Sequence, residues 1–306
     1  MVTNTANMKQ TAAKKHVRKI APFTAVSAVI LIILCLSLII PFIWGLITAF
    51  KTPLEYVGDK LGFPTDWTLA NFAEAFKNFT VKVPSGTGSV TYNVWGMLLW
   101  SAIYAVGGAI IQAMSCALVA YAVARFNKFK ISKVLYSIVI ITMILPIVGA
   151  MPSELRILRA LGIYNTIFGM LILKANFLGA YFLMFHAFFS HIPKDYYEAA
   201  AIDGAGNFTI LFRIVFPMVK TLFWTIVLLY FLGNWNDYNI TLIYAPSYPT
   251  LAYGLYSFNM SNNPEIADTP HKMAGAMMLF IPIFLFFCIF QKKLIGENLS
   301  AGGIKG

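Results

Sequence analysis

Six long apolar runs constrain the fold of this chain more than any other feature of its sequence. An α-helix needs about 20 apolar residues to cross the hydrocarbon core of a bilayer, because it rises only about 1.5 Å per residue. The sequence predicts six such helices, near residues 23–50, 94–124, 131–152, 163–190, 209–236 and 273–292. The fold class that follows is an all-α integral membrane protein.

The composition supports this prediction. Only 11% of the 306 residues are charged, whereas soluble domains carry about 25%. The first run, residues 23–50, is much longer than the 7–15 apolar residues of a signal peptide and is followed by no convincing cleavage site. We therefore expect it to remain as the first membrane helix.

The basic residues predict the orientation. Five precede the first run, four lie in the short loop 125–133, three lie between 194 and 220, and three follow the last run. Basic clusters beside apolar segments are typical of cytoplasmic loops, so both termini are expected inside. A nucleic-acid site would need basic residues on a soluble face instead, and the net charge of +11 therefore does not indicate one.

This topology divides the chain into a cytoplasmic segment 1–22, a six-helix transmembrane domain 23–292 and a cytoplasmic tail 293–306. In the outer segment 51–93, helical spacing of apolar residues predicts a short amphipathic helix capped by Thr68. Residues 84–89 are expected to form a flexible loop. Ser153 is the predicted cap of a second outer helix, and the outer segment 239–271 is rich in Tyr, Pro and Asn.

The inner loop after residue 190 contains a predicted short helix of unusual composition. Pro193 suits a first helical turn, and Asp195 and Glu198 suit the positive end of the helix dipole. Three alanines follow, and Gly204 permits the left-handed residue that ends a helix. Small side chains would let a partner close onto this helix, although an ordinary interfacial helix is the alternative.

The same loop resembles the EAA loop of permease subunits in binding-protein-dependent ABC importers. The matching positions are Glu198, Ala199, Asp203, Gly204, Ala205, Phe212, Ile214 and Pro217, while Phe216 replaces the usual Leu. The resemblance implies a type I ABC importer permease fold in which residues 193–207 form the coupling helix that sits in a cleft of the ATPase subunit. The residues expected to make this coupling are Glu198, Ala199, Ala200, Asp203, Gly204, Ala205 and Pro217.

Two further stretches are similar to the sugar-importer permeases. Residues 120–126 resemble the end of their second span, although small residues there also suit helix packing. Residues 233–238 place aromatic and amide groups that suit sugar binding at Asn234, Trp235, Asn236, Asp237 and Tyr238. Trp and Tyr also gather at membrane interfaces, so these five residues are candidates for the substrate pathway with that alternative open.

The C-terminal residues 291–306 resemble the ending of the maltose-transporter-like class, carbohydrate uptake family 1. In that family the tail reaches toward the ATPase dimer, and the resemblance implies contacts from Ser300, Gly302, Gly303 and Lys305.

Other chemistry is not indicated. The chain has no Walker A sequence, its four histidines are scattered, and its three cysteines lie in apolar runs where they act as small hydrophobic residues. No catalytic or metal-binding residue is predicted. Glu154 and Lys174 come nearest to ionisable residues within a span, and both are expected in its outer third.

The sequence thus predicts a multi-pass permease of the bacterial cytoplasmic membrane, in an ATP-driven importer for carbohydrates, with oligosaccharides favoured. The implied partners are a second, different permease, two ATP-binding subunits and an extracytoplasmic sugar-binding protein. No cofactor is expected on this chain, because ATP and magnesium would bind the ATPase subunits. An ion-coupled carrier, a membrane enzyme, and an importer for polyols or glycerol phosphates are the alternatives.

Overall fold

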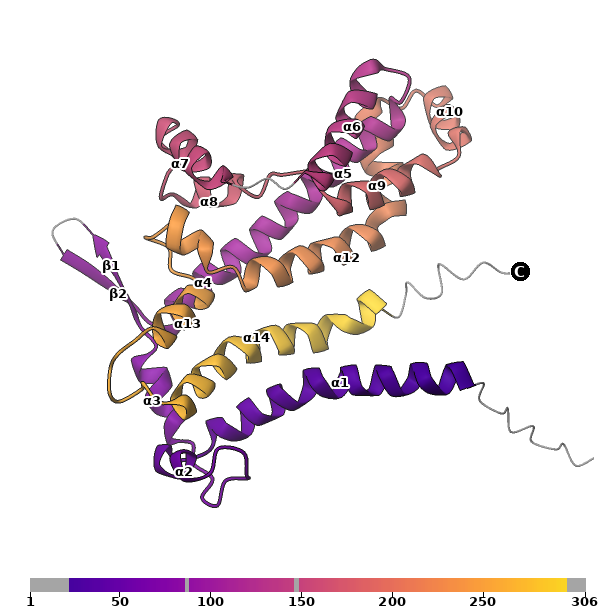
Figure 1. Cartoon of the computed structure of the whole chain (residues 1–306). Coiled ribbons are helices and arrows are strands. Elements are labelled where there is room, and N and C mark those ends of the chain that lie inside the picture. The colour runs from indigo at the N-terminus through magenta and orange to yellow at the C-terminus, as the bar shows by residue number, and fades with distance from the viewer. Residues whose placement is uncertain (1–21, 86–87, 146–148, 296–306) are drawn as a thin grey trace, which may run out of the picture.

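A computed structural model describes residues 22–85, 88–145 and 149–295. The long helices lie side by side in one bundle, and most of the shorter elements lie at one end of it (Figure 1). The elements in chain order are α1 (Pro22–Ala49), α2 (Pro53–Gly58), α3 (Ala70–Asn78), β1 (Val81–Ser85), β2 (Gly88–Tyr92), α4 (Val94–Ala102), η1 (Ile103–Gly107), α5 (Gly108–Arg125), α6 (Lys130–Ile144), α7 (Ala150–Ala160), α8 (Ile167–Ile172), α9 (Ala180–Ser190), α10 (Lys194–Ile202), α11 (Asn207–Thr209), η2 (Ile210–Val215), α12 (Phe216–Trp235), η3 (Ile240–Tyr244), α13 (Leu251–Asn259) and α14 (Thr269–Ile295).

Four helices in the described ranges are long and apolar enough to cross a membrane. They are Phe23–Ala49, Val94–Arg125, Asn207–Trp235 and Thr269–Cys288. These four agree with the first, second, fifth and sixth predicted spans. Helix α1 contacts α14 and leaves its apolar side chains exposed, as expected for a surface that faces lipid or another membrane subunit (Figure 1).

The third and fourth predicted spans are not continuous helices. Helix α6 ends at Ile144 because Leu145, which precedes Pro146, adopts an extended conformation with ψ 124°. The run 163–190 is divided into α8 and α9, and residues 173–179 between them are not α-helical. Gly179 immediately precedes α9 and has a φ of 124°, a backbone conformation that residues with a side chain rarely adopt.

Three local predictions for the outer segments need correction. Residues 84–85 and 88–89, expected in a flexible loop, belong to paired antiparallel strands in which Pro84 pairs with Ser89, so the fold is not purely helical. Ser153 lies inside α7 and does not cap it. Thr68 is not the N-cap of the amphipathic helix, because the helix begins at Ala70 and Leu69 occupies the cap position. The Thr68 hydroxyl still accepts a hydrogen bond from the Ala70 amide.

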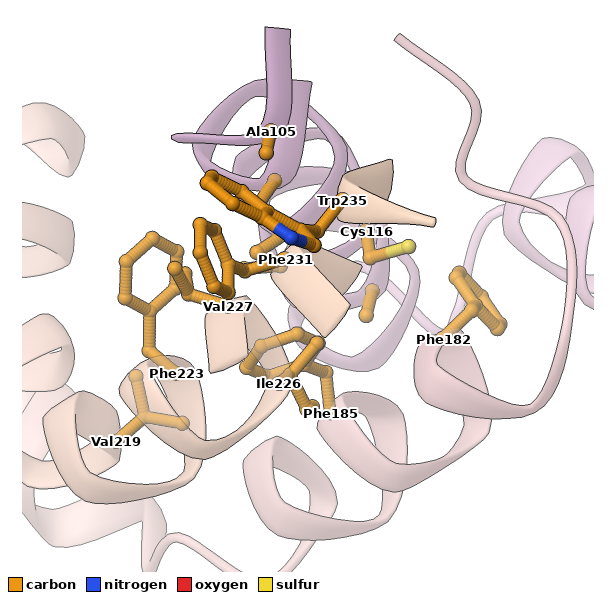
Figure 2. Close-up of a cluster of buried hydrophobic side chains, with 14 of the residues drawn as sticks. Ala105, Cys116, Phe182, Phe185, Val219, Phe223, Ile226, Val227, Phe231 and Trp235 are labelled. Atoms are coloured by element: carbon orange, nitrogen blue, oxygen red, sulfur yellow. The ribbon is translucent and has the colours of Figure 1, made fainter. Parts of the chain in front are cut away.

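The core lies where α12 packs against α5 and α9. Helix α5 contributes a small-residue face that includes Ala109, Ala113 and Cys116, and this face lets the neighbouring helices approach closely. Large side chains from α9 and α12 fill the space, among them Phe185 and Phe223 (Figure 2). This packing holds α12 in the middle of the bundle, between α5 and α14.

The elements at the two ends of the bundle differ. Helix α10, the first residues of α1 and the last residues of α14 lie at one end, which we call the α10 end (Figure 1). At the opposite end, α3 is joined to α14 through His271, whose ring nitrogens lie 2.7 Å from the Glu74 and Asp268 carboxylates. Asn71 of α3 also donates to the Ala49 and Lys51 carbonyls, which satisfies backbone groups at the end of α1.

Candidate functional site

Helix α10 is a short helix that lies outside the helix bundle and is anchored to it by one face. Pro193 precedes its first residue, and Asp195 lies in the first turn, as predicted. Tyr197 and Ala200 are its buried residues and face the bundle. The Arg125 guanidinium at the end of α5 lies 4.3 Å from the Tyr197 ring, which adds a cation–π contact to this anchor. Burial raises the pKa of the Tyr197 hydroxyl, so it stays neutral there.

The C-terminus of α10 is closed by a Schellman motif. Gly204 has a φ of 77°, which confirms the predicted left-handed residue. The Ala205 amide donates to the Ala200 carbonyl at 2.9 Å, and the Gly204 amide donates to the Ala201 carbonyl at 3.1 Å. These bonds satisfy carbonyls that a helix end would otherwise leave unpaired, so α10 is a defined element and not a frayed loop.

The outward face of this segment is exposed and partly apolar. Glu198, Ala199 and Asp203 are exposed on it, next to Ile202 at 86% and Phe208 at 80% exposure. We call these five residues the α10 surface. Large apolar side chains with such exposure beside exposed carboxylates are typical of a surface that a partner covers.

The structure separates the seven predicted coupling residues. Glu198, Ala199, Asp203 and Gly204 are exposed together, but Ala200 is buried against the bundle and Ala205 is half-buried. Pro217 lies in the first turn of α12, after the π-helical segment η2. Pro217 has no N–H to donate to the preceding turn. The turn before it is π-helical, and there the Phe216 amide donates to the carbonyl of Leu211, five residues earlier.

We expect Gly204→Ala to loosen the end of α10, because an L-residue at positive φ costs about 1–2 kcal/mol. Gly206→Ala is the matched control, since both glycines have open space around the missing Cβ but Gly206 has a φ of −70°. Amide hydrogen exchange of residues 199–205 should be about 5–30-fold faster in Gly204→Ala and unchanged in Gly206→Ala. Equal exchange rates in the two variants would show that the positive φ at residue 204 does not strain a residue with a side chain.

A polar cluster lies at the opposite end of α12 from α10. Asp237 accepts a hydrogen bond from the Tyr104 hydroxyl at 2.6 Å and forms an ion pair with Lys174 at 3.2 Å. The Lys174 ammonium also lies 5.3 Å from the Tyr104 ring. The second Asp237 oxygen accepts hydrogen bonds from the Asn239 and Ile240 amides, so both carboxylate oxygens have two partners each.

Lys174 belongs to the non-helical segment between α8 and α9. Non-helical backbone in a membrane protein is tolerated where it is covered by protein or lines a water-filled cavity. The Lys174 side chain passes over Gly108, where a Cβ would lie 3.3 Å from its Cγ and 3.0 Å from the Asn234 Nδ2. Asn234 is buried, and its Nδ2 has no hydrogen-bond partner among the described residues. An unpaired buried donor beside an ion pair marks a place where a polar ligand could bind.

The five predicted pathway residues differ in their surroundings. Trp235 is buried, packs on Phe231 and donates to the Leu279 carbonyl at 3.4 Å, so it belongs to the core between α12 and α14 (Figure 2). Asn236 is exposed, and its side chain bonds back to the Leu232 carbonyl. Tyr238 is 37% exposed and stacks on Tyr256 with ring centroids 4.8 Å apart. Only Asn234 and Asp237 join the polar cluster.

The sequence reasoning missed Tyr104 and the pairing of Lys174 with Asp237. A lone lysine in an apolar run and an aspartate at the end of another were the available signals. A second pair that the sequence did not predict is Tyr244 with Glu154, in which the Tyr244 hydroxyl donates a hydrogen bond to the carboxylate. Burial and this hydrogen bond raise the pKa of Tyr244, so its hydroxyl keeps its proton. In the described ranges no group of three or more His, Cys, Asp or Glu side chains could hold a metal ion.

The sequence of this chain is similar to those of a known class of membrane proteins. Residues 113–295, which include α10 and, from the polar cluster, Lys174, Asn234 and Asp237, match the family of binding-protein-dependent transport system inner membrane components. This chain belongs to that family. It is a permease subunit and a multi-pass protein of the cytoplasmic membrane.

Relatives of this permease align over most of its length. It is 30% identical to the melibiose/raffinose/stachyose import permease protein of Bacillus subtilis, over 87% of this chain and 91% of the relative. It is 26% identical to the diacetylchitobiose uptake system permease protein of Streptomyces coelicolor, over 90% and 87%. The maltodextrin transport system permease protein of Bacillus subtilis is 28% identical over 90% and 94%.

A solved structure supports the fold of the permease. A bacterial ABC transporter involved in the import of the acidic polysaccharide alginate has a chain with a TM-score of 0.70, covering 88% of this permease and 95% of that chain. At 21% identity this likeness shows the fold alone, which is the type I ABC importer permease fold. The predicted tail residues Ser300, Gly302, Gly303 and Lys305 lie outside the described residues.

Proposed function

We propose that this permease carries a carbohydrate, of the oligosaccharide class, across the cytoplasmic membrane in an ATP-driven importer. The observation that carries the proposal is that the sugar-import permeases above align with about nine-tenths of this chain.

The proposed topology has six spans with both termini inside. Helix α6 and the α8–α9 segment supply the third and fourth spans, although α6 has only 15 residues and α9 has 11. At about 1.5 Å per residue α6 is about 22 Å long, so these spans depend on protein neighbours to cover their ends. The first residues of α1 and the last residues of α14 lie toward the same end of the molecule as α10, which supports this arrangement (Figure 1).

In the proposed mechanism the α10 surface docks into an ATP-binding subunit. Two such subunits hold ATP and magnesium, and their closure moves α10 together with α9 and α12. Moving a population of transporters between two states takes several kcal/mol, more than one exposed charge pair contributes. The exposed Ile202 and Phe208 and the small Ala199 support a buried, shape-matched contact.

The polar cluster at the other end of α12 is the proposed substrate site of this subunit. The unpaired Asn234 amide, next to the Asp237–Lys174 ion pair, could donate a hydrogen bond to a sugar hydroxyl, which can accept it. A second, different permease would complete the pathway, and a sugar-binding protein would deliver the cargo.

Transport by the assembled importer in vesicles tests the function. With its binding protein outside and ATP inside, we expect sugar uptake that requires ATP and persists when ion gradients are collapsed. Uptake driven by an ion gradient without ATP would instead establish the secondary-carrier alternative. Identifying the sugar that the binding protein retains would name the cargo, or replace sugars by a polyol or glycerol phosphate.

The binding protein is proposed to contact the segment 239–271. This segment contains buried residues, such as Leu251 and Phe258, so shortening it would remove part of the core. Met260, at the end of α13, is 66% exposed. We expect Met260→Asp to reduce the stimulation of ATP hydrolysis by loaded binding protein severalfold, because an apolar contact would be replaced by a charge.

A matched control is Leu61→Asp, which changes an 83% exposed apolar residue at the same end but outside this segment. Stimulation should be retained in this control. Full stimulation in Met260→Asp, or an equal loss in both variants, would contradict a specific contact at α13.

A further inference from the structure

The segment 125–133, from the end of α5 to the first turn of α6, concentrates positive charge that no carboxylate of the described residues balances. Arg125, Lys128, Lys130 and Lys133 lie within nine residues, and none of them forms an ion pair with a carboxylate among the described residues. Lys130 and Lys133 occupy the first turn of α6, where the helix dipole disfavours cations. That turn also contains no acidic residue and has no side-chain cap. An anion from outside the chain would relieve both conflicts.

A cavity of about 480 Å³ opens directly beside this turn. Asn127, Lys133, Tyr136, Ser137 and His186 line it with their side chains. None of these side chains has a hydrogen-bond partner among the described residues. His186 makes ring contacts with Tyr136 and Phe182 instead. The cavity thus offers at least four side-chain donors around a cation, which is the chemistry that holds a phosphate.

Exposed apolar side chains also lie along α6, on the face next to the one that lines the cavity. Ile131, Val134, Ile138 and Ile141 are between 40% and 68% exposed on this helix. A soluble anion such as free phosphate has no apolar part that could contact these side chains. A phospholipid would contact both parts, with its headgroup near Lys133 at the cavity and an acyl chain along the apolar side chains.

We propose that the cavity between α5, α6 and α9 is a binding site for an anionic phospholipid. The headgroup phosphate lies at the first turn of α6, close to Lys133, and the acyl chains follow α6 toward the membrane centre. The site rests on the proposed orientation, in which the α10 end faces the anionic inner leaflet. Because Tyr197 of α10 contacts Arg125 of the same loop, the lipid would brace the anchor of α10.

The assembled importer tests this site with phosphatidylglycerol as the probe. The complex, purified in detergent, is titrated with phosphatidylglycerol, phosphatidylcholine or inorganic phosphate, and bound lipid is counted by native mass spectrometry. We expect phosphatidylglycerol to bind in preference to phosphatidylcholine, and inorganic phosphate not to displace it. Lys133→Gln should weaken phosphatidylglycerol binding about fivefold, the effect expected for one cation near an anionic lipid.

Lys220→Gln is the matched control, because Lys220 of α12 is an exposed cation at the α10 end but does not line the cavity. Binding should be unchanged in this control. A photocrosslinking residue at Ser137 should form adducts with lipid in vesicles that contain phosphatidylglycerol. Equal binding of the two lipids, equal effects of the two lysine variants, displacement by free phosphate, or crosslinks to a partner subunit would each overturn the proposal.

Discussion

Replacing Glu198 with lysine is expected to abolish ATP-driven uptake while the permease still inserts and folds. Glu198 is exposed and has no partner among the described residues, so the change should alter the permease's own stability by less than about 0.5 kcal/mol. In the docked complex the carboxylate would be covered beside Ala199, and a reversed charge there typically costs 2–5 kcal/mol. ATPase subunits should therefore bind at least about thirtyfold more weakly.

Two measurements separate lost docking from lost folding. Co-purification of the ATPase subunits should fall in Glu198→Lys, while the amount of permease in the membrane and its melting temperature stay the same. Asp66→Lys is the control, since it reverses an exposed carboxylate at the opposite end of the bundle. Normal ATP-driven uptake in Glu198→Lys would refute docking at the α10 surface.

Breaking the Lys174–Asp237 pair is expected to have unequal effects from its two sides. In Asp237→Asn the Lys174 ammonium loses its carboxylate and keeps only the Tyr104 ring among the described residues. In Lys174→Met the Asp237 carboxylate keeps the Tyr104 hydroxyl and two backbone amides as donors. Leaving a charge without a partner is the costly outcome, so Asp237→Asn should be the more harmful change.

We expect Asp237→Asn to lower the free energy of unfolding by about 2–4 kcal/mol and Lys174→Met by about 1 kcal/mol. The first value is below that of a fully buried pair because the two side chains are 21% and 23% exposed. The double variant should be no worse than Lys174→Met, because no charge is then left unpaired. Denaturant unfolding of the purified complex measures the three variants, and equal losses in both single variants would show that the ion pair contributes little.

Lys174 and Trp235 show how far the sequence could predict the candidate sites. Both were singled out by residue type, yet one joins the polar cluster and the other belongs to the core. Helix α12 is apolar on every side, so its sequence carries no periodic signal of which face is buried. By contrast, the Pro193–Gly204 segment was predicted closely, because caps and turn residues act within one or two turns of the chain.

The membrane class, the four long spans and the ends of α10 follow from the sequence, because hydropathy and helix capping are local properties that sum along consecutive residues. The division of the fourth apolar run, the burial of Ala200 and the meeting of Lys174, Tyr104 and Asp237 were decided only by the tertiary structure. The meeting of these three side chains joins η1, the α8–α9 segment and the end of α12, which are distant in sequence. The physical cause is packing: small residues on α5 let α12 and α9 approach, and that approach selects which polar side chains meet.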